Sequence, residues 1–153
     1  YGCKNLIRVG TAGALMPDVH VRDMVFAMGA CTTSNFVRLL GLPGDYSPVC
    51  SYSLLERAVA AARERGLSFH VGNVFSSDVF YEDLNGEKGT WARMGVLVQE
   101  METFSLYCTA ARAGRRALSI LTAGSSLHSS AALTNEEREK NLDAMIRCAL
   151  AFA

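Results

Sequence analysis

Apolar and polar positions along the chain follow two patterns, short unbroken apolar runs and longer segments with helical periodicity. The apolar runs are each bounded by turn residues, which is typical of buried strands. They predict strands at Leu6–Val9, Val19–Met28, Leu67–Val71, Gly95–Val98 and Ala117–Thr122. Helical segments lie between the runs, so the pattern predicts an α/β fold in which helices cover a sheet.

Capping boxes, in which a serine or threonine precedes a glutamate by three residues, predict the starts of two helices. One begins at Ser53–Glu56 and is ended by Gly66. The other begins at Thr134–Glu137 and continues through an apolar face formed by Leu142, Met145, Ile146, Ala149 and Leu150. A further helix is predicted over Glu102–Arg112, ended by Gly114, whereas residues 32–50 contain two prolines and predict an irregular excursion.

The composition indicates one globular domain. The 153 residues are 50% hydrophobic and 20% charged, which excludes a disordered chain. Fifteen basic residues balance fifteen acidic ones, which argues against a nucleic-acid-binding protein and favours association with other chains. Since Tyr1 to Asn5 lead directly into an apolar run without an initiator Met, we expect an N-terminal piece to precede this single domain.

The five cysteines are widely spaced and form no CxxC pair, so they predict reduced thiols and neither a disulfide framework nor a zinc site. The chain has no apolar run of about 18 residues and no signal peptide pattern. We therefore expect a cytoplasmic protein without a membrane partner.

Arg8, Gly10 and Thr11 lie in a segment, residues 8–13, where an apolar run gives way to small residues. Glycines let backbone N–H groups approach an oxyanion, and arginine adds a charged bidentate donor, so one interpretation is an anion cradle. The other is a tight turn with an arginine salt bridge. The segment satisfies neither the dinucleotide fingerprint nor the P-loop pattern.

Two further segments place polar or aromatic side chains at strand ends. In residues 98–102, Glu100 and Glu102 flank a methionine, and such glutamates accept hydrogen bonds from a polyol; alternatively, Glu102 simply lies favourably at a helix N-terminus. In residues 76–81, Phe80 and Tyr81 either form a stacking wall for a flat base or pack in the core.

Residues 120–138 contain serines, His128 and Arg138. The GxSxG motif is absent and no acid follows in the expected order, so a serine hydrolase is not indicated. Arg138 lies in a charge run over residues 136–140, which usually forms a solvated helix face. His20 and His70 have no ligand spacing to each other and are interpreted as structural.

Taken in order, these segments resemble the hexameric bacterial type of purine nucleoside phosphorylase, within the wider family that includes uridine phosphorylase. The resemblance covers essentially the whole chain and is carried by IRVGTAGAL, HVRDMVFAMGACT, VGNVFSSDVFY, GVLVQEMETFSLY and the TNEER helix start. It implies a three-layer α/β fold with a mixed central sheet flanked by helices. It also implies reversible phosphorolysis, in which phosphate attacks the anomeric carbon of a nucleoside and releases the base and ribose 1-phosphate.

The resemblance assigns roles residue by residue. Arg8 and Thr11, with Gly10 between them, match phosphate-binding positions, and Met101 and Glu102 match ribose contacts. Phe80 matches the aromatic residue on the base, with Ser77 and Gln99 at neighbouring base-pocket positions. Thr11 is more like the uridine phosphorylase branch, and Gln99 replaces a small apolar residue.

The chain departs from the family at the general acid. Purine-type members carry Ser-Asp where this chain has Gly124-Ser125, and Arg138 matches the arginine that partners that Asp. A serine hydroxyl donates a hydrogen bond but hardly a proton near neutral pH, and general acid catalysis is worth roughly 10²–10⁴-fold. The uridine-specific Gln-x-Arg pair is not evident between Tyr81 and Met94.

We therefore expect a nucleoside phosphorylase for a purine nucleoside, with Ser125 and Arg138 at the catalytic positions. The alternatives are a family member that binds nucleoside or sugar phosphate without turnover, and a structural paralogue. Inorganic phosphate would be the co-substrate, with no cofactor and no metal. The resemblance also implies a homohexamer in purine salvage.

Overall fold

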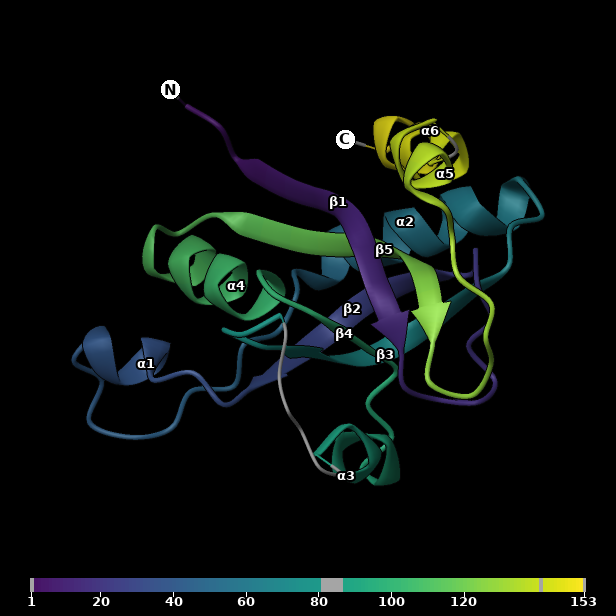
Figure 1. Cartoon of the computed structure of the whole chain (residues 1–153). Helices are drawn as coiled ribbons and strands as arrows, with labels where there is room; N and C mark the ends of the chain where they lie inside the picture. The colour runs from purple at the N-terminus through teal and green to yellow at the C-terminus, as the bar shows by residue number, and fades with distance from the viewer. Residues whose placement is uncertain (1, 81–86, 141, 153) are drawn as a thin grey trace.

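The computed structural model describes residues 2–80, 87–140 and 142–152 and shows a mixed sheet with helices packed on it (Figure 1). The strands are β1 (Asn5–Ala14), β2 (Met24–Thr32), β3 (Phe69–Ser76), β4 (Val98–Glu100) and β5 (Arg116–Ser126). The helices are α1 (Phe36–Leu39), α2 (Tyr52–Glu64), α3 (Glu87–Arg93), α4 (Thr103–Arg112), α5 (Asn135–Lys140) and α6 (Asp143–Leu150).

The predicted mixed sheet flanked by helices is confirmed, and the sheet closes on itself in the order β1-β4-β3-β2-β5. β1 runs parallel to β5 along its whole length, and their arrowheads lie side by side in Figure 1. β5 also pairs antiparallel with the start of β2, which completes the closure. The carboxyl ends of β1 and β5 consequently meet at one edge.

β5 separates two apolar clusters, because its successive side chains point to opposite faces. Ala117, Leu121 and Ala123 pack in a cluster with residues of α4. Leu118 and Ile120 are fully buried in the other cluster, with residues of α2 and α6. Burial of each large aliphatic side chain contributes about 1.5–3 kcal/mol, so these side chains anchor β5 on both of its faces.

Tyr107 fixes α4 on the sheet. Its hydroxyl donates to the Ala27 carbonyl oxygen at 2.6 Å and accepts from the Ser119 amide at 2.9 Å. Burial raises the pKa of Tyr107 above its ordinary value, which keeps the hydroxyl protonated as a donor. The middle of α4 is thus held by both β2 and β5, and the start of this helix borders the candidate site.

The strand boundaries correct several predictions. Residues 10–13 form no turn but continue β1, because their backbone pairs with residues 121–125 of β5. β2 begins at Met24, after turns over residues 16–22, and continues past Gly29 through a register shift. β3 begins at Phe69 and runs to Ser76, and β4 begins only at Val98.

The helix starts also differ from the prediction. The capping box at Ser53 is wrong: α2 begins at Tyr52 after Ser51, whose hydroxyl accepts instead from the Ala117 amide at 3.1 Å. The capping box at Thr134 is confirmed by reciprocal hydrogen bonds with Glu137. Two helices, α5 and α6, follow it in place of the single helix predicted. Of the predicted apolar face, Met145 and Ala149 of α6 are buried, whereas Ile146 and Leu150 are exposed.

Two short helices, α1 and α3, lie in the connections between strands: α1 in residues 32–50 and α3 before β4. The 32–50 excursion is largely irregular, as predicted, and contains only the short α1. The sequence pattern did not predict α3. Within the described residues, no helix combines the length and the hydropathy that a membrane span requires.

Candidate active site

A cavity of about 560 Å³ lies at the carboxyl ends of β1 and β5 and beside the β4–α4 junction. We call it the Arg8 cavity. Most of the predicted site residues line it: Arg8, Thr11, Phe80, Gln99, Met101, Glu102, Ser125 and Arg138. Gly10 and Ser77 are not among its lining residues.

Arg8 is the main cation of this cavity. Its Nη2 forms an ion pair with Glu102 and lies 3.4 Å from Oε2 of Glu100. Its Nη1 is buried and has no hydrogen-bond partner among the described residues. A buried donor without a partner costs free energy, so this nitrogen is suited to an anion that enters the cavity.

Gly10 provides the space that Arg8 occupies. A Cβ atom added at Gly10 would lie 2.6 Å from Nη1 of Arg8, closer than real Cβ contacts. Because Gly10 has no side chain, the guanidinium group can lie directly over the backbone of β1 at this residue. This is a different role from the direct contact with the ligand that the resemblance implies.

Glu100 lies in the Arg8 cavity, and the sequence analysis gave it no separate role among the site residues. Its side chain is 1% exposed, and its carboxylate accepts hydrogen bonds from the Ser76 hydroxyl and from the amides of Glu102 and Thr103 at 3.0 Å. These bonds and Arg8 compensate the buried carboxylate. The available signal was an acid on the buried face of a strand, directly before a helix.

Glu102 and Met101 line the cavity at its more open part. Glu102 precedes the first residue of α4, as the helix-terminus interpretation required, but its side chain forms no cap hydrogen bond. Its side chain is 58% exposed and is directed to Arg8 instead. The carboxylate therefore faces the cavity from a helix start that Glu100 holds in place.

Gln99, Gly13 and Ser125 form a row across three adjacent strands. Gly13 pairs in register with Gln99 of β4 on one side and with Ser125 of β5 on the other. A Cβ atom at Gly13 would lie 3.3 Å from the Ser125 hydroxyl oxygen. Because Gly13 has no side chain, no atoms beyond the backbone separate the side chains of Gln99 and Ser125 at this position, and both line the cavity.

Arg138 lies against the end of β5 and not on a solvated helix face, so that interpretation is wrong. Its guanidinium group crosses Gly124, donating to the Gly124 carbonyl oxygen at 3.2 Å and to the Leu133 carbonyl oxygen at 3.3 Å. Its neighbour Glu137 pairs with Arg22, and hydrogen bonds from the backbone and side chain of Thr134 and from Arg22 lower the pKa of Glu137. These contacts anchor α5 over the cavity.

Phe80 is 67% exposed and lines the cavity beside Val79, so the core-packing interpretation is wrong for it. Ser77 is buried, and its hydroxyl bonds the backbone of Val79 within the turn that leads to Phe80. Tyr81, the second aromatic residue of the predicted pair, lies outside the described residues.

The histidines have structural contacts away from the cavity. His20 and His70 both contact Asp23; burial raises the pKa of Asp23, but hydrogen bonds from His20, Ser68 and His70 outweigh it and lower the value. His128 bonds the Leu15 carbonyl oxygen at 2.8 Å. Among the described residues no histidine, cysteine or acid cluster is suited to a metal ion.

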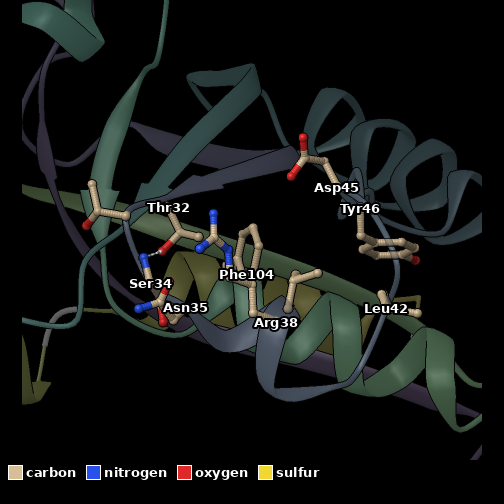
Figure 2. A pocket seen from close by; sticks show the side chains of 11 residues that line it. Thr32, Ser34, Asn35, Arg38, Leu42, Asp45, Tyr46 and Phe104 are labelled. Carbon is tan, nitrogen blue, oxygen red and sulfur yellow. Dashed lines mark hydrogen bonds between the residues drawn. The ribbon is translucent and has the colours of Figure 1, made fainter.

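A second cavity of about 530 Å³ lies at the 32–46 excursion. Figure 2 shows Thr32, Ser34 and Asn35 on one side of it and Leu42, Asp45 and Tyr46 on the other. It contains none of the predicted site residues, so the Arg8 cavity is the candidate active site.

Comparison with known proteins places these residues in a family context. The family model described as the phosphorylase superfamily matches residues 1–153. A DeoD-type purine nucleoside phosphorylase of Geobacillus kaustophilus is 48% identical over 153 residues, all of this chain and 64% of that protein. Proteins of the same name from Bacillus cereus (47%, 98% of this chain and 64% of that protein) and Caldanaerobacter subterraneus subsp. tengcongensis (46%, 100% and 66%) are similar. The chain thus spans less than two thirds of the length of these relatives.

Proposed function

Since the chain belongs to the phosphorylase superfamily, we propose that the Arg8 cavity is the site of reversible phosphorolysis of a nucleoside, in the first place a purine nucleoside. The observation that carries the proposal is the buried, unpartnered Nη1 of Arg8 in a cavity that Thr11, Glu102 and Phe80 also line. The names of the relatives, all purine nucleoside phosphorylases, support the same reaction.

The proposed chemistry assigns phosphate to Arg8 and Thr11. Glu102 forms an ion pair with Nη2 of Arg8, so a phosphate that binds Arg8 competes with this carboxylate. Glu102, released from the ion pair, then accepts hydrogen bonds from the two ribose hydroxyls, since one carboxylate accommodates both. Binding of phosphate and binding of ribose are therefore coupled through one ion pair.

In the proposed step, an oxygen of monohydrogen phosphate forms a bond with the anomeric carbon while the glycosidic carbon–nitrogen bond breaks. The bonding electron pair leaves with the base, and the proton of the phosphate ester passes through solvent to the base anion. Alignment of phosphate, ribose and base in one cavity supplies much of the rate. The co-substrate is inorganic phosphate, and we propose that no cofactor is needed.

Ser125 leaves this site without the usual proton donor. General acid catalysis contributes roughly 10²–10⁴-fold, so turnover slower by this factor is expected for bases that leave only when protonated. Arg138 keeps the position next to the missing acid, but its guanidinium group is held by two backbone carbonyl groups.

The test is phosphate-dependent release of base from inosine, adenosine and uridine, with ribose 1-phosphate measured in parallel. The proposal predicts formation of base and ribose 1-phosphate in equal amounts from at least one nucleoside. Turnover indistinguishable from background with all three would exclude an active phosphorylase.

A second candidate function is binding of nucleoside or sugar phosphate without turnover, which Ser125 favours. Calorimetric affinity for ligand without turnover supports it, and restored turnover in Ser125→Asp shows that the scaffold is competent. Equal rates in the parent and Ser125→Asp argue that the acid is unnecessary or supplied by another group. A stable oligomer in sedimentation, with neither binding nor turnover, would indicate a structural paralogue.

We further propose that the protein is a cytoplasmic homohexamer that acts in purine salvage.

A further inference from the structure

We infer that Gln99, Ser125 and Arg138 form a subsite for the carbonyl edge of a lactam base, a ring with adjacent C=O and N–H groups, and that this subsite disfavours aminopurines. The inference deepens the proposed function and rests on it for the identity of the ligand as a base. It assigns to Gln99 a role in base selection.

The first argument is the geometry of the row. Gln99 and Ser125 lie on either side of Gly13, in register with it, and all three residues line the cavity. Gln99 lines the cavity, and its side-chain amide forms no hydrogen bond with another of the described residues. An amide that faces a cavity in this way offers one donor and one acceptor side by side, which matches the donor and acceptor of a lactam edge.

The row is distant from Arg8. The guanidinium group of Arg8 lies over Gly10, three residues before Gly13 on β1, so at roughly 3.3 Å per residue it lies about 10 Å from the row. A ligand that places its anionic group at Arg8 therefore directs its opposite end toward the row. Phe80, exposed beside Val79, lines the same cavity and offers an aromatic face to a flat ring.

The second argument is the balance of donors and acceptors at the row. A guanidinium group only donates hydrogen bonds, whereas amide and hydroxyl groups donate or accept. The carboxylates of the cavity, Glu100 and Glu102, are directed to Arg8. Arg138 is thus the only charged group of the described lining residues at the row, and its charge is positive.

A positive charge with neutral hydrogen-bonding groups favours a carbonyl oxygen over an amino group. The amide of Gln99 then donates to this oxygen and accepts from the adjacent ring N–H. An amino group of adenine in the same place would direct its positively polarised hydrogens at Arg138. Hydrogen bonds to charged groups are among the stronger ones in proteins, so the difference is measurable.

The experiment measures calorimetric affinities of the purified protein for hypoxanthine, uracil and adenine, and kcat/KM for inosine, uridine and adenosine. We expect the parent protein to bind hypoxanthine, uracil or both about tenfold more tightly than adenine, a difference of about 1.4 kcal/mol. The two lactam bases distinguish a purine-sized subsite from a pyrimidine-sized one. Gln99→Val is expected to reduce the preference to about threefold or less.

Gln99→Glu is the sharper variant, because it keeps the size of the side chain and replaces the donor by an acceptor. It is expected to reverse the preference toward adenine. Thermal unfolding of each variant verifies that it folds, and the measurement on the parent tests the inference even if a variant does not fold.

Equal affinities of the parent for the three bases, tighter binding of adenine, or no measurable binding of any base would overturn the inference. A preference that Gln99→Val and Gln99→Glu leave unchanged would overturn the role of Gln99. If the preference for lactam bases is present while no nucleoside is cleaved, the phosphorolysis proposal fails and the base subsite stands.

Discussion

The two ends of the Arg8 cavity are stabilised in different ways. At the Arg8 end, the guanidinium group of Arg8 and the carboxylates of Glu100 and Glu102 compensate one another. At the Ser125 end, formed by Gln99, Ser125 and Arg138, the cation is held by backbone carbonyl groups and no carboxylate faces it among the described lining residues. On the proposed function, this difference assigns recognition of a charged group to the Arg8 end and leaves the Ser125 end without a carboxylic acid as proton donor.

The largest effect is expected for Arg8→Ala, which removes the cation of the charged end. Loss of one positioned donor to a reacting anion typically costs about 10²–10³-fold in rate, so phosphate-dependent kcat/KM should fall by at least this factor. Arg147→Ala removes an exposed arginine that pairs only at the surface, and it should leave turnover unchanged. A loss of less than about fivefold in Arg8→Ala would show that phosphate binds elsewhere.

Glu100→Gln should have the next largest effect, on stability. The change leaves Glu102 as the only carboxylate of the described residues beside the Arg8 guanidinium group, and it weakens the hydrogen bonds that hold the start of α4. Breaking a buried ion pair costs about 3–5 kcal/mol, so we expect a loss of stability of this size. The free energy of unfolding in urea measures it, with the exposed Glu56→Gln as the control. A loss within about 0.5 kcal/mol, the usual range of surface substitutions, would contradict the structural role of Glu100.

Gly10→Ala tests the positioning of Arg8 without removing any charge. The added Cβ atom would lie 2.6 Å from Nη1, so the guanidinium group must move. We expect the KM for phosphate to rise about tenfold, which corresponds to about 1.4 kcal/mol. Gly89→Ala is the matched control, since a Cβ atom at Gly89 meets nothing within 4 Å. Equal KM values in the two variants would show that Arg8 does not need Gly10.

The smallest effect is expected for Glu137→Gln at the Ser125 end. Because hydrogen bonds lower the pKa of Glu137 below its ordinary value of 4.5, its contribution to stability is present above that pH and is lost as the pH falls through the lowered value. The melting temperature of Glu137→Gln should therefore lie slightly below that of the parent at neutral pH and converge with it in acid. A constant difference at all pH values would exclude the ionised carboxylate as the cause.

The sequence predicted the residues that line this site better than the residues that hold them in position. Arg8, Glu102, Phe80 and Ser125 were recognised because their motifs are local and ordered along the chain. The role of Glu100 was missed because its partners, Ser76 and Arg8, are distant in sequence and meet it only in the folded sheet. The role of Gly10 was likewise missed, since it depends on where a neighbouring side chain lies.

The fold shows the same division between local and long-range information. Each of the five strands in the described residues overlaps a predicted apolar run, β4 only at Val98, but residues 10–13 were predicted as a turn because glycine-rich sequence is locally flexible. Their pairing with β5 overrides that tendency. The Thr134 capping box was correct because its hydrogen bonds are local, whereas Ser51, not Ser53, precedes α2 because its hydroxyl contacts Ala117 of β5.

The most direct test of the division between the two ends measures Gly10→Ala and Gln99→Val in one assay. Base release from inosine and adenosine is followed over a range of phosphate concentrations. We predict that Gly10→Ala raises the phosphate KM and leaves the inosine-to-adenosine ratio of kcat/KM unchanged, whereas Gln99→Val changes that ratio and leaves the phosphate KM unchanged. If both variants change the same quantity, or if neither changes either one, the two ends do not have separate roles.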